Sequence, residues 1–134
     1  MMQKYRDMGI KLTPQRLAIL EYLEGNEDHP SADDIYTEIK KKFPMMSFAT
    51  VYNTLETLKK RGDLVELTID PERRHYDPDT RHHHHLICRK CKKILDIHRD
   101  FSIEIPEDQK GTFEVLGNHI EFYGICPSCK MKGE

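Results

Sequence analysis

Two C-x2-C pairs constrain the fold of this chain more than any other feature of its sequence. Cys88 and Cys91 form the first pair, and 34 residues separate them from Cys126 and Cys129 near the C-terminus. Two thiolates at this spacing reach one ion from a tight turn, and the second pair completes a tetrahedral zinc site. With no secretory signal evident, such cysteines are metal ligands more often than disulfides. The sequence therefore predicts one structural Zn2+ bound by these four cysteines.

A run of four histidines, 82–85, directly precedes the first cysteine pair. In an extended strand His83 and His85 point to the same face, and alternation in the next expected strand turns Asp96 toward them. Imidazoles mixed with carboxylates suit an exchangeable divalent transition metal better than a closed structural site. We therefore expect a second metal site here. A lone histidine is usually structural, which is how we interpret His75 and His98.

Three helices are predicted in the N-terminal half, after a short helix expected at residues 1–8. Thr13, Ser31 and Ser47 are favourable N-cap residues, and a proline follows Thr13 at the first helical position. Three short helices joined by short connections form a helix-turn-helix core. The apolar side chains that recur at helical spacing are Leu17, Leu20, Leu23, Ile35, Tyr36, Ile39, Val51, Leu55 and Leu58.

The outward face of the helix after Ser47 is typical of a helix that reads DNA. It carries small or hydrogen-bonding side chains and almost no charge before the basic stretch 59–61, whereas solvated faces usually carry Glu and Lys. Small side chains let a helix enter the major groove, a tyrosine packs on thymine methyls, and basic groups bind phosphates. The candidate DNA-binding residues are Arg16, Ser47, Ala49, Thr50, Tyr52, Asn53, Thr57 and Arg74.

A β-hairpin is predicted next. Residues 64–69 alternate as a strand, 70–72 form a turn, and 73–76 return. A hairpin behind a recognition helix is the wing of a winged helix, and Arg74 is expected to face the sugar-phosphate backbone.

We interpret the chain as an α+β protein of two domains. Residues 1–77 are expected to form a winged helix-turn-helix DNA-binding domain, 78–81 a polar hinge, and 82–134 a small α/β dimerisation domain with structural zinc. Residues 1–80 contain twelve basic and fifteen acidic side chains, so DNA binding must depend on a local basic face. In the second domain, strands are expected at 82–88, 92–98 and 113–125, and a single helical turn at 106–108.

Five motifs resemble those of the ferric uptake regulator family of metal-dependent repressors, and the resemblance covers nearly the whole chain. They are LTPQR at 12–16, HPSADDIY at 29–36, SFATVYN at 47–53, HHHLIC at 83–88 and YGIC at 123–126. The resemblance implies a homodimer that binds an AT-rich inverted repeat of double-stranded DNA when loaded with metal. The lack of a secretory signal and of an apolar run long enough for a membrane helix predicts a cytoplasmic protein with no membrane partner. It also implies that a regulatory ion joins the two domains, through the ligands His29, Asp77, His83, His85 and Asp96.

The resemblance leaves the sensed signal open. Asp96, and Asp77 after a tyrosine, resemble the peroxide-sensing branch, in which ferrous iron reacts with peroxide and a ligand histidine, His29 or His83 here, is oxidised. Fe2+ is favoured as the regulatory ion, and a manganese- or zinc-sensing regulator is the alternative. Some relatives hold a further metal site. Its candidates here are His82, His84, Glu104 and His119, with Asn118 where the family has histidine.

Two interpretations from other classes compete with a regulator. A small metalloenzyme would use His83, His85 and Asp96 on an open metal, and a zinc-ribbon adaptor would use the helices to bind protein. No HExxH helix and no constellation of a nucleophile with a general acid accompanies the histidines. We therefore predict that the protein is a regulator and not an enzyme.

Overall fold

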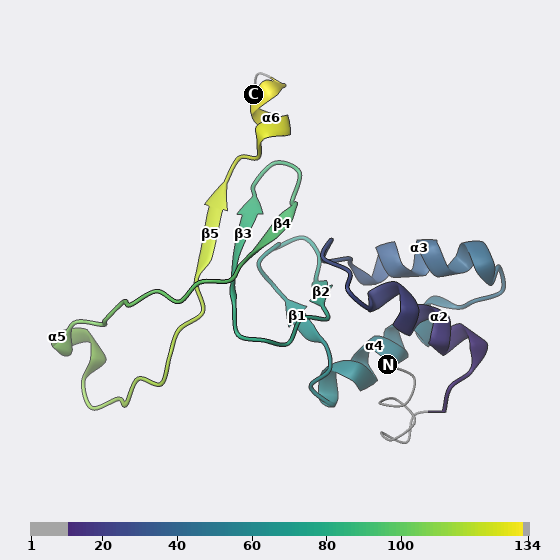
Figure 1. Cartoon of the computed structure of the whole chain (residues 1–134), viewed down its shortest axis with the longest axis horizontal. Helices are drawn as coiled ribbons and strands as arrows, with labels where there is room; N and C mark the ends of the chain where they lie inside the picture. The colour runs from purple at the N-terminus through teal and green to yellow at the C-terminus, as the bar shows by residue number, and fades with distance from the viewer. Residues whose placement is uncertain (1–10, 133–134) are drawn as a thin grey trace. The chain divides into compact units, whose positions relative to one another are not determined.

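The structure is a computed structural model that describes residues 11–132, so the helix predicted at 1–8 lies outside the described residues. The chain divides into two compact units, the first ending at Thr80 and the second beginning at Arg81. Within residues 11–132, the first unit contains three helices and a two-stranded sheet, and the second contains a three-stranded sheet and two short helices (Figure 1). None of the described helices is long and apolar enough to cross a membrane.

The helices α2 (Pro14–Leu23), α3 (Ala32–Lys42) and α4 (Phe48–Lys60) begin at the predicted caps. The hydroxyl oxygens of Thr13, Ser31 and Ser47 each accept a hydrogen bond from the backbone N–H three residues later. At Ser31 the contact is reciprocal, because the Asp34 carboxylate also accepts from the Ser31 backbone N–H. These caps satisfy backbone donors that no helical carbonyl can reach.

The apolar faces of these helices meet in one core. Leu17 and Tyr36 are only half-buried, although their spacing predicted core positions. The ring of Tyr36 instead packs edge-on against Phe48, with ring centroids 5.7 Å apart. The fully packed members of the core are Ile19, Leu20, Leu23, Ile35, Ile39, Met46, Val51, Leu55, Leu58, Leu64 and Tyr76.

The wing is present but shorter than predicted. Strands β1 (Val65–Leu67) and β2 (His75–Asp77) pair antiparallel, with Glu66 opposite Tyr76. Asp70 is buried beyond the end of β1, where its carboxylate accepts from the N–H of Glu72 and contacts His75. The chain between the strands is therefore a folded loop rather than an extension of the ladder.

In the second unit, β3 (His84–Cys88) lies at the centre of the sheet. It pairs antiparallel with β4 (Ile94–Ile97) and parallel with β5 (Glu121–Gly124) (Figure 1). The antiparallel register places His85 opposite Asp96 and Ile87 opposite Ile94. The predicted α+β class is confirmed.

The long strand predicted at 113–125 was wrong over most of its length, because only β5 is paired. The side chains of Phe113 and Leu116 are 79% and 90% exposed, and within the described residues this stretch lies against no strand. A strand needs a partner for its backbone donors and acceptors. The predicted helical turn exists as α5 (Glu107–Lys110), whereas α6 (Pro127–Met131) was not predicted.

Buried apolar side chains are scarce in the second unit. Among its described residues, the buried core consists of Ile87, Ile94, Cys88 and Cys129, while three histidines of the run 82–85 are buried as well. So small an apolar core contributes little stability by itself. The cysteines must therefore contribute to folding by more than their packing.

Candidate metal centres and nucleic-acid interface

The four cysteines of the second unit form one cluster. Their sulfur atoms lie within 4.8 Å of one another, and none is in a disulfide. Cys88 ends β3 and lies 3.7 Å from Cys129, and Cys91 lies 3.7 Å from Cys126, the N-cap of α6. Four sulfur atoms that each lie about 2.3 Å from one Zn2+, at tetrahedral angles, are about 3.8 Å from one another.

Backbone donors favour the thiolate form of Cys88. N–H donation from Cys91, and also from Cys126, lowers the pKa of the Cys88 thiol to about 5. The amide of Cys126 reaches the Cys88 sulfur at 3.3 Å. A thiolate is the form that binds metal. Both the donor set and the spacing therefore fit a structural Zn2+.

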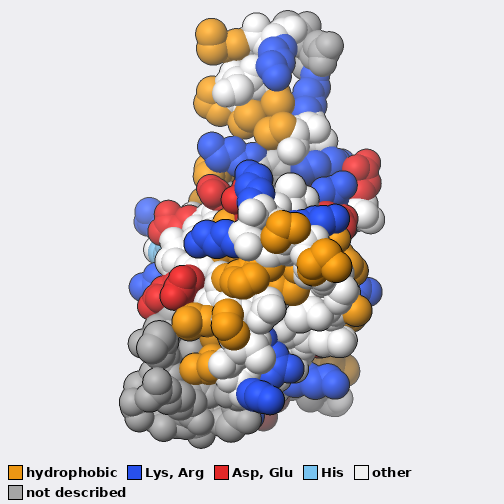
Figure 2. All heavy atoms as spheres, turned by 90° about the vertical axis from the view of Figure 1, so that its right-hand side faces the viewer, with side chains coloured by type: hydrophobic (Ala, Val, Ile, Leu, Met, Phe, Trp, Pro, Cys, Tyr) orange, Lys and Arg blue, Asp and Glu red, His pale blue; other side chains and the backbone are white. Residues whose placement is uncertain are grey.

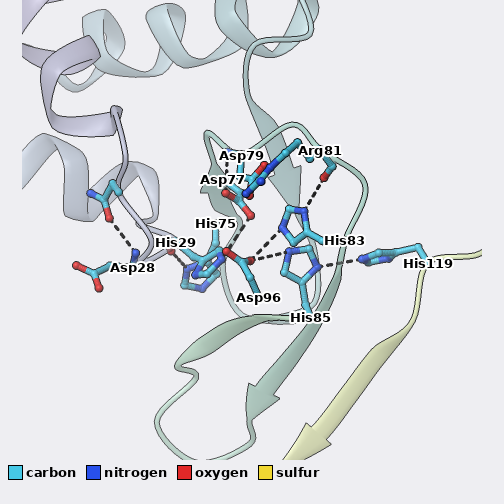
Figure 3. Close-up of polar contacts among 11 residues, drawn as sticks. Asp28, His29, His75, Asp77, Asp79, Arg81, His83, His85, Asp96 and His119 are labelled. Atoms are coloured by element: carbon cyan, nitrogen blue, oxygen red, sulfur yellow. Dashed lines mark hydrogen bonds and ion pairs between the residues drawn. The ribbon is translucent and has the colours of Figure 1, made fainter. Parts of the chain in front are cut away.

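In the first unit, His29 and Asp77 form a buried pair (Figure 3). Nε2 of His29 lies 3.4 Å from Oδ2 of Asp77, and both residues are at most 2% exposed. His29 precedes α3 in the loop of the first unit, and Asp77 is the last residue of β2. One imidazole and one carboxylate offer two ligands of the kind that bind divalent transition metals.

In the second unit, Asp96 contacts two histidines (Figure 3). Its Oδ1 atom lies 3.0 Å from Nε2 of His83 and 3.4 Å from Nε2 of His85. The Nδ1 atom of His83 donates to the carbonyl of Arg81 at 2.6 Å, which orients Nε2 toward the carboxylate. The contact of Asp96 with His83 and His85 is therefore the one that strand alternation predicted.

His119 extends this arrangement in a way that its sequence position did not reveal. Its Nε2 atom lies 3.0 Å from Nδ1 of His85, on the side of the ring away from Asp96 (Figure 3). Burial lowers the pKa of His119, so a neutral ring contacts His85 at neutral pH. A partner at Nδ1 fixes the orientation of a histidine that binds metal through Nε2.

Three candidates for a further metal site have neighbouring rings, with centroids 5.1 Å apart for His82 and His84 and 6.0 Å apart for His84 and His119. His84 is buried, its Nδ1 atom accepts the backbone N–H of Ile120, and burial lowers its pKa. In the described part of the chain, His82, His84, Glu104 and His119 do not bring their donor atoms together as the cysteines do. We therefore assign His84 a structural role between β3 and the start of β5.

The outward face of α4 is accessible as predicted. Tyr52 is 39% exposed and its ring stacks on Phe48, while the Thr57 hydroxyl donates to the carbonyl of Asn53. Thr50 is half-buried and shares a hydrogen bond with the Ser47 hydroxyl. The exposed members of the predicted set on this helix and its cap are Ser47, Ala49, Tyr52, Asn53 and Thr57.

Basic side chains border the beginning of α4. Arg16 lines an open hollow of about 650 Å³ together with Lys11, Lys42, Ser47 and Thr50, and its guanidinium donates to the Lys11 carbonyl. Basic, acidic and apolar side chains are interspersed on the face of the molecule in Figure 2. On this face, basic side chains alternate with acidic and apolar ones and do not form one continuous positive surface, which agrees with the acidic balance of residues 1–80.

Arg74, predicted to contact the DNA backbone, forms an ion pair on the wing. Its guanidinium lies 2.9 Å from Oε1 of Glu66, whose other oxygen lies 2.6 Å from Lys59 at the end of α4. Glu66 is nearly buried and raises the pKa of Lys59. One carboxylate therefore lies between two cations that a nearby phosphate would attract, and Lys59 also lies 3.3 Å from Glu56.

Comparisons with known proteins agree over most of the chain. The sequence model of the ferric uptake regulator family matches residues 7–123. The peroxide-responsive repressor PerR of Staphylococcus epidermidis is 40% identical over 130 residues, which are 96% of this chain and 87% of that protein. The peroxide operon regulator of Bacillus subtilis is 40% identical over 133 residues, with coverages of 98% and 92%. The solved ferric uptake regulator of Francisella tularensis with iron is 29% identical, has a TM-score of 0.71, and matches 91% of this chain and 96% of that one.

Proposed function

Because this chain belongs to the ferric uptake regulator family of metal-responsive transcriptional repressors, we propose that one exchangeable divalent ion joins its two units and thereby controls DNA binding. Members of this family bind DNA, form dimers and are regulators rather than enzymes. The proposal assigns each group of metal ligands on the chain a separate task.

Structural Zn2+ is assigned to Cys88, Cys91, Cys126 and Cys129. Four thiolates close the coordination sphere, so this ion has no open position for substrate or signal. Zn2+ held in this way stabilises the second unit, whose apolar core is small.

The regulatory ion is assigned to His29 and Asp77 of the first unit and to His83, His85 and Asp96 of the second. The observation that supports this assignment is that each unit has its own buried imidazole–carboxylate contact. Two ligands alone hold a divalent ion weakly, whereas five imidazole and carboxylate ligands suit Fe2+ or Mn2+. An ion that needs ligands from both units favours a single arrangement of the two. A tenfold gain in DNA affinity requires only about 1.4 kcal/mol of such coupling.

The operator is proposed to be an AT-rich inverted repeat. A symmetric dimer presents two copies of α4 to two half-sites, and Tyr52 offers an aromatic ring for thymine methyl groups. Lys11, Arg16 and Lys42 line the hollow beside the beginning of α4, and this supports their binding to phosphates that flank the groove. A repressor acts where the DNA is, so we place the protein in the cytoplasm.

Peroxide is proposed as the signal and Fe2+ as the regulatory ion. Two relatives at 40% identity carry peroxide in their names, and Asp96 resembles that branch. Fe2+ held by these residues would supply the redox chemistry that activates peroxide next to its ligands. In the net change, one oxygen atom of H2O2 is inserted into a ring C–H bond of His29 or His83 to give C–OH. The ring loses two electrons, and the other peroxide oxygen leaves as water. The oxidised ring binds metal poorly, so the ion and the DNA are released.

The test is a gel shift with a promoter fragment. The protein keeps Zn2+ at its four-cysteine site throughout. Addition of Fe2+ or Mn2+ should retard the fragment, and peroxide should reverse the retardation only for the Fe2+ form. Mass spectrometry should then find one added oxygen in the peptide of His29 or His83. If the promoter fragment is retarded equally with and without added metal, the proposed regulatory site is wrong. A metalloenzyme would instead show turnover without retardation, and an adaptor would show neither.

A further inference from the structure

His29 has a backbone conformation that a residue of its type rarely adopts. Its φ is 52°, in the left-handed region, and the next residue is Pro30. A proline normally places the preceding residue in an extended conformation, and the left-handed conformation is unfavourable for a residue with a side chain. Such conformations persist only where surrounding contacts hold them, and they occur frequently at functional sites.

A buried histidine holds the carbonyl of His29. Nδ1 of His75 lies 2.6 Å from that oxygen, and since a carbonyl only accepts, the ring nitrogen is the donor. The other ring nitrogen, Nε2, lies 2.9 Å from Oδ2 of Asp70. His29, His75 and Asp70 are 2%, 8% and 4% exposed, so water does not compete for these contacts. The imidazole of His75 is therefore oriented at both nitrogens.

The same strand holds His29 at a second point. His75 is the first residue of β2 and Asp77 is the last, so their side chains project to the same face. Asp77 contacts the ring of His29 at Nε2, 3.4 Å away, whereas His75 contacts its backbone. The N–H of Tyr76 donates to the carbonyl of Pro30 at 2.9 Å, and an isolated β-bridge joins Ser31 to His75. Strand β2 thus restrains the ligand loop on both sides of the imidazole.

From these contacts we infer that Asp70 and His75 are positioning residues for the metal ligand His29. This inference rests on the proposed function, in which His29 binds the regulatory ion. Asp70 orients the ring of His75, His75 holds the left-handed backbone of His29, and the imidazole is in place before metal arrives. Binding then requires no further ordering of the loop, which raises affinity. Neither residue contacts the ion.

The inference is tested by metal titration of the full-length, zinc-loaded protein. His75→Phe keeps the ring volume but removes the donor, and His75→Asn places an amide donor near the former Nδ1. Thr54→Val is the matched control, because it removes one buried side-chain donor to a carbonyl of the same unit, that of Thr50. His29→Ala defines the loss of the site itself. Mn2+ affinity is measured by calorimetry, and the visible absorption of bound Co2+ reports the ligand geometry.

Loss of a group that orients a metal ligand typically weakens metal binding by about ten- to a hundredfold, and we expect His75→Phe to do so. His75→Asn should recover most of this loss, and Thr54→Val should bind Mn2+ as the wild type does with an unchanged Co2+ spectrum. Wild-type affinity in His75→Phe, or equal weakening in His75→Asn or Thr54→Val, would overturn the inference and leave the proposed function intact. If His29→Ala binds as tightly as the wild type, the proposed function fails first.

Discussion

Asp96 and His85 lie directly opposite each other in the antiparallel pair of β3 and β4, and Oδ1 of Asp96 is 3.4 Å from Nε2 of His85. The same oxygen is 3.0 Å from Nε2 of His83. A single carboxylate therefore aligns two imidazoles through the atoms that would bind metal. In the absence of an ion, this contact keeps the three ligands of the second unit together.

Replacement of His85 by alanine should abolish metal-dependent DNA binding and leave the dimer folded. The variant loses one ligand of the exchangeable site, whereas the four cysteines are unchanged. Gel shifts with and without metal measure the first effect, and size-exclusion chromatography measures the second. A monomeric or unfolded His85→Ala protein would mean that this histidine is structural.

Replacement of Tyr52 by alanine should weaken operator binding by about 1–3 kcal/mol, the range for loss of a base-edge contact. The ring is exposed on α4 and stacked on Phe48, so the wild-type contact surface exists before DNA binds. Tyr52→Phe keeps the apolar ring face and should bind with nearly wild-type affinity. Titrations with operator and random DNA measure both variants. If the wild-type protein binds operator and random DNA with equal affinity, Tyr52 does not recognise bases.

Removal of zinc by a strong chelator should unfold the second unit and spare α2, α3 and α4. Binding of zinc to short peptides contributes on the order of 10 kcal/mol, which exceeds what so few buried apolar residues supply. The helices have a separate core of eleven buried side chains. Hydrogen exchange resolved along the chain distinguishes the two units. Persistent protection of β3 and β4 after chelation would contradict a structural role for the ion.

Replacement of Glu66 by glutamine should strengthen binding to random DNA. Glu66 pairs with both Lys59 and Arg74, so its loss leaves Arg74 for phosphates and leaves Lys59 with only the weaker contact to Glu56 at 3.3 Å. One or two added phosphate contacts steepen the dependence of log affinity on log salt by about 0.9 each. Glu21→Gln, which removes an exposed carboxylate from α2, is the matched control and should change the slope little. An unchanged slope in Glu66→Gln would show that neither cation meets DNA.

The elements that were predicted correctly are those whose cause is local. A serine or threonine cap bonds to an amide three residues away, so Thr13, Ser31 and Ser47 identify the beginnings of helices without knowledge of the fold. Alternation along a strand likewise predicted that Asp96 would meet His83 and His85. The prediction of a strand at 113–125 was wrong because the extent of a strand depends on a pairing partner. Only the residues from Glu121 onward pair with β3.

The amino-acid sequence by itself determined the four cysteine ligands, the helix caps, the polar outward face of α4 and the supply of imidazoles and carboxylates, since each depends on residue type and short spacing. Only the tertiary structure decided that His75 holds the carbonyl of His29 and that Glu66 binds both Lys59 and Arg74. His29 and His75 are 46 residues apart, and no local pattern links them. Their contact exists because the wing folds β2 against the loop before α3, and packing of that kind is set by the whole unit.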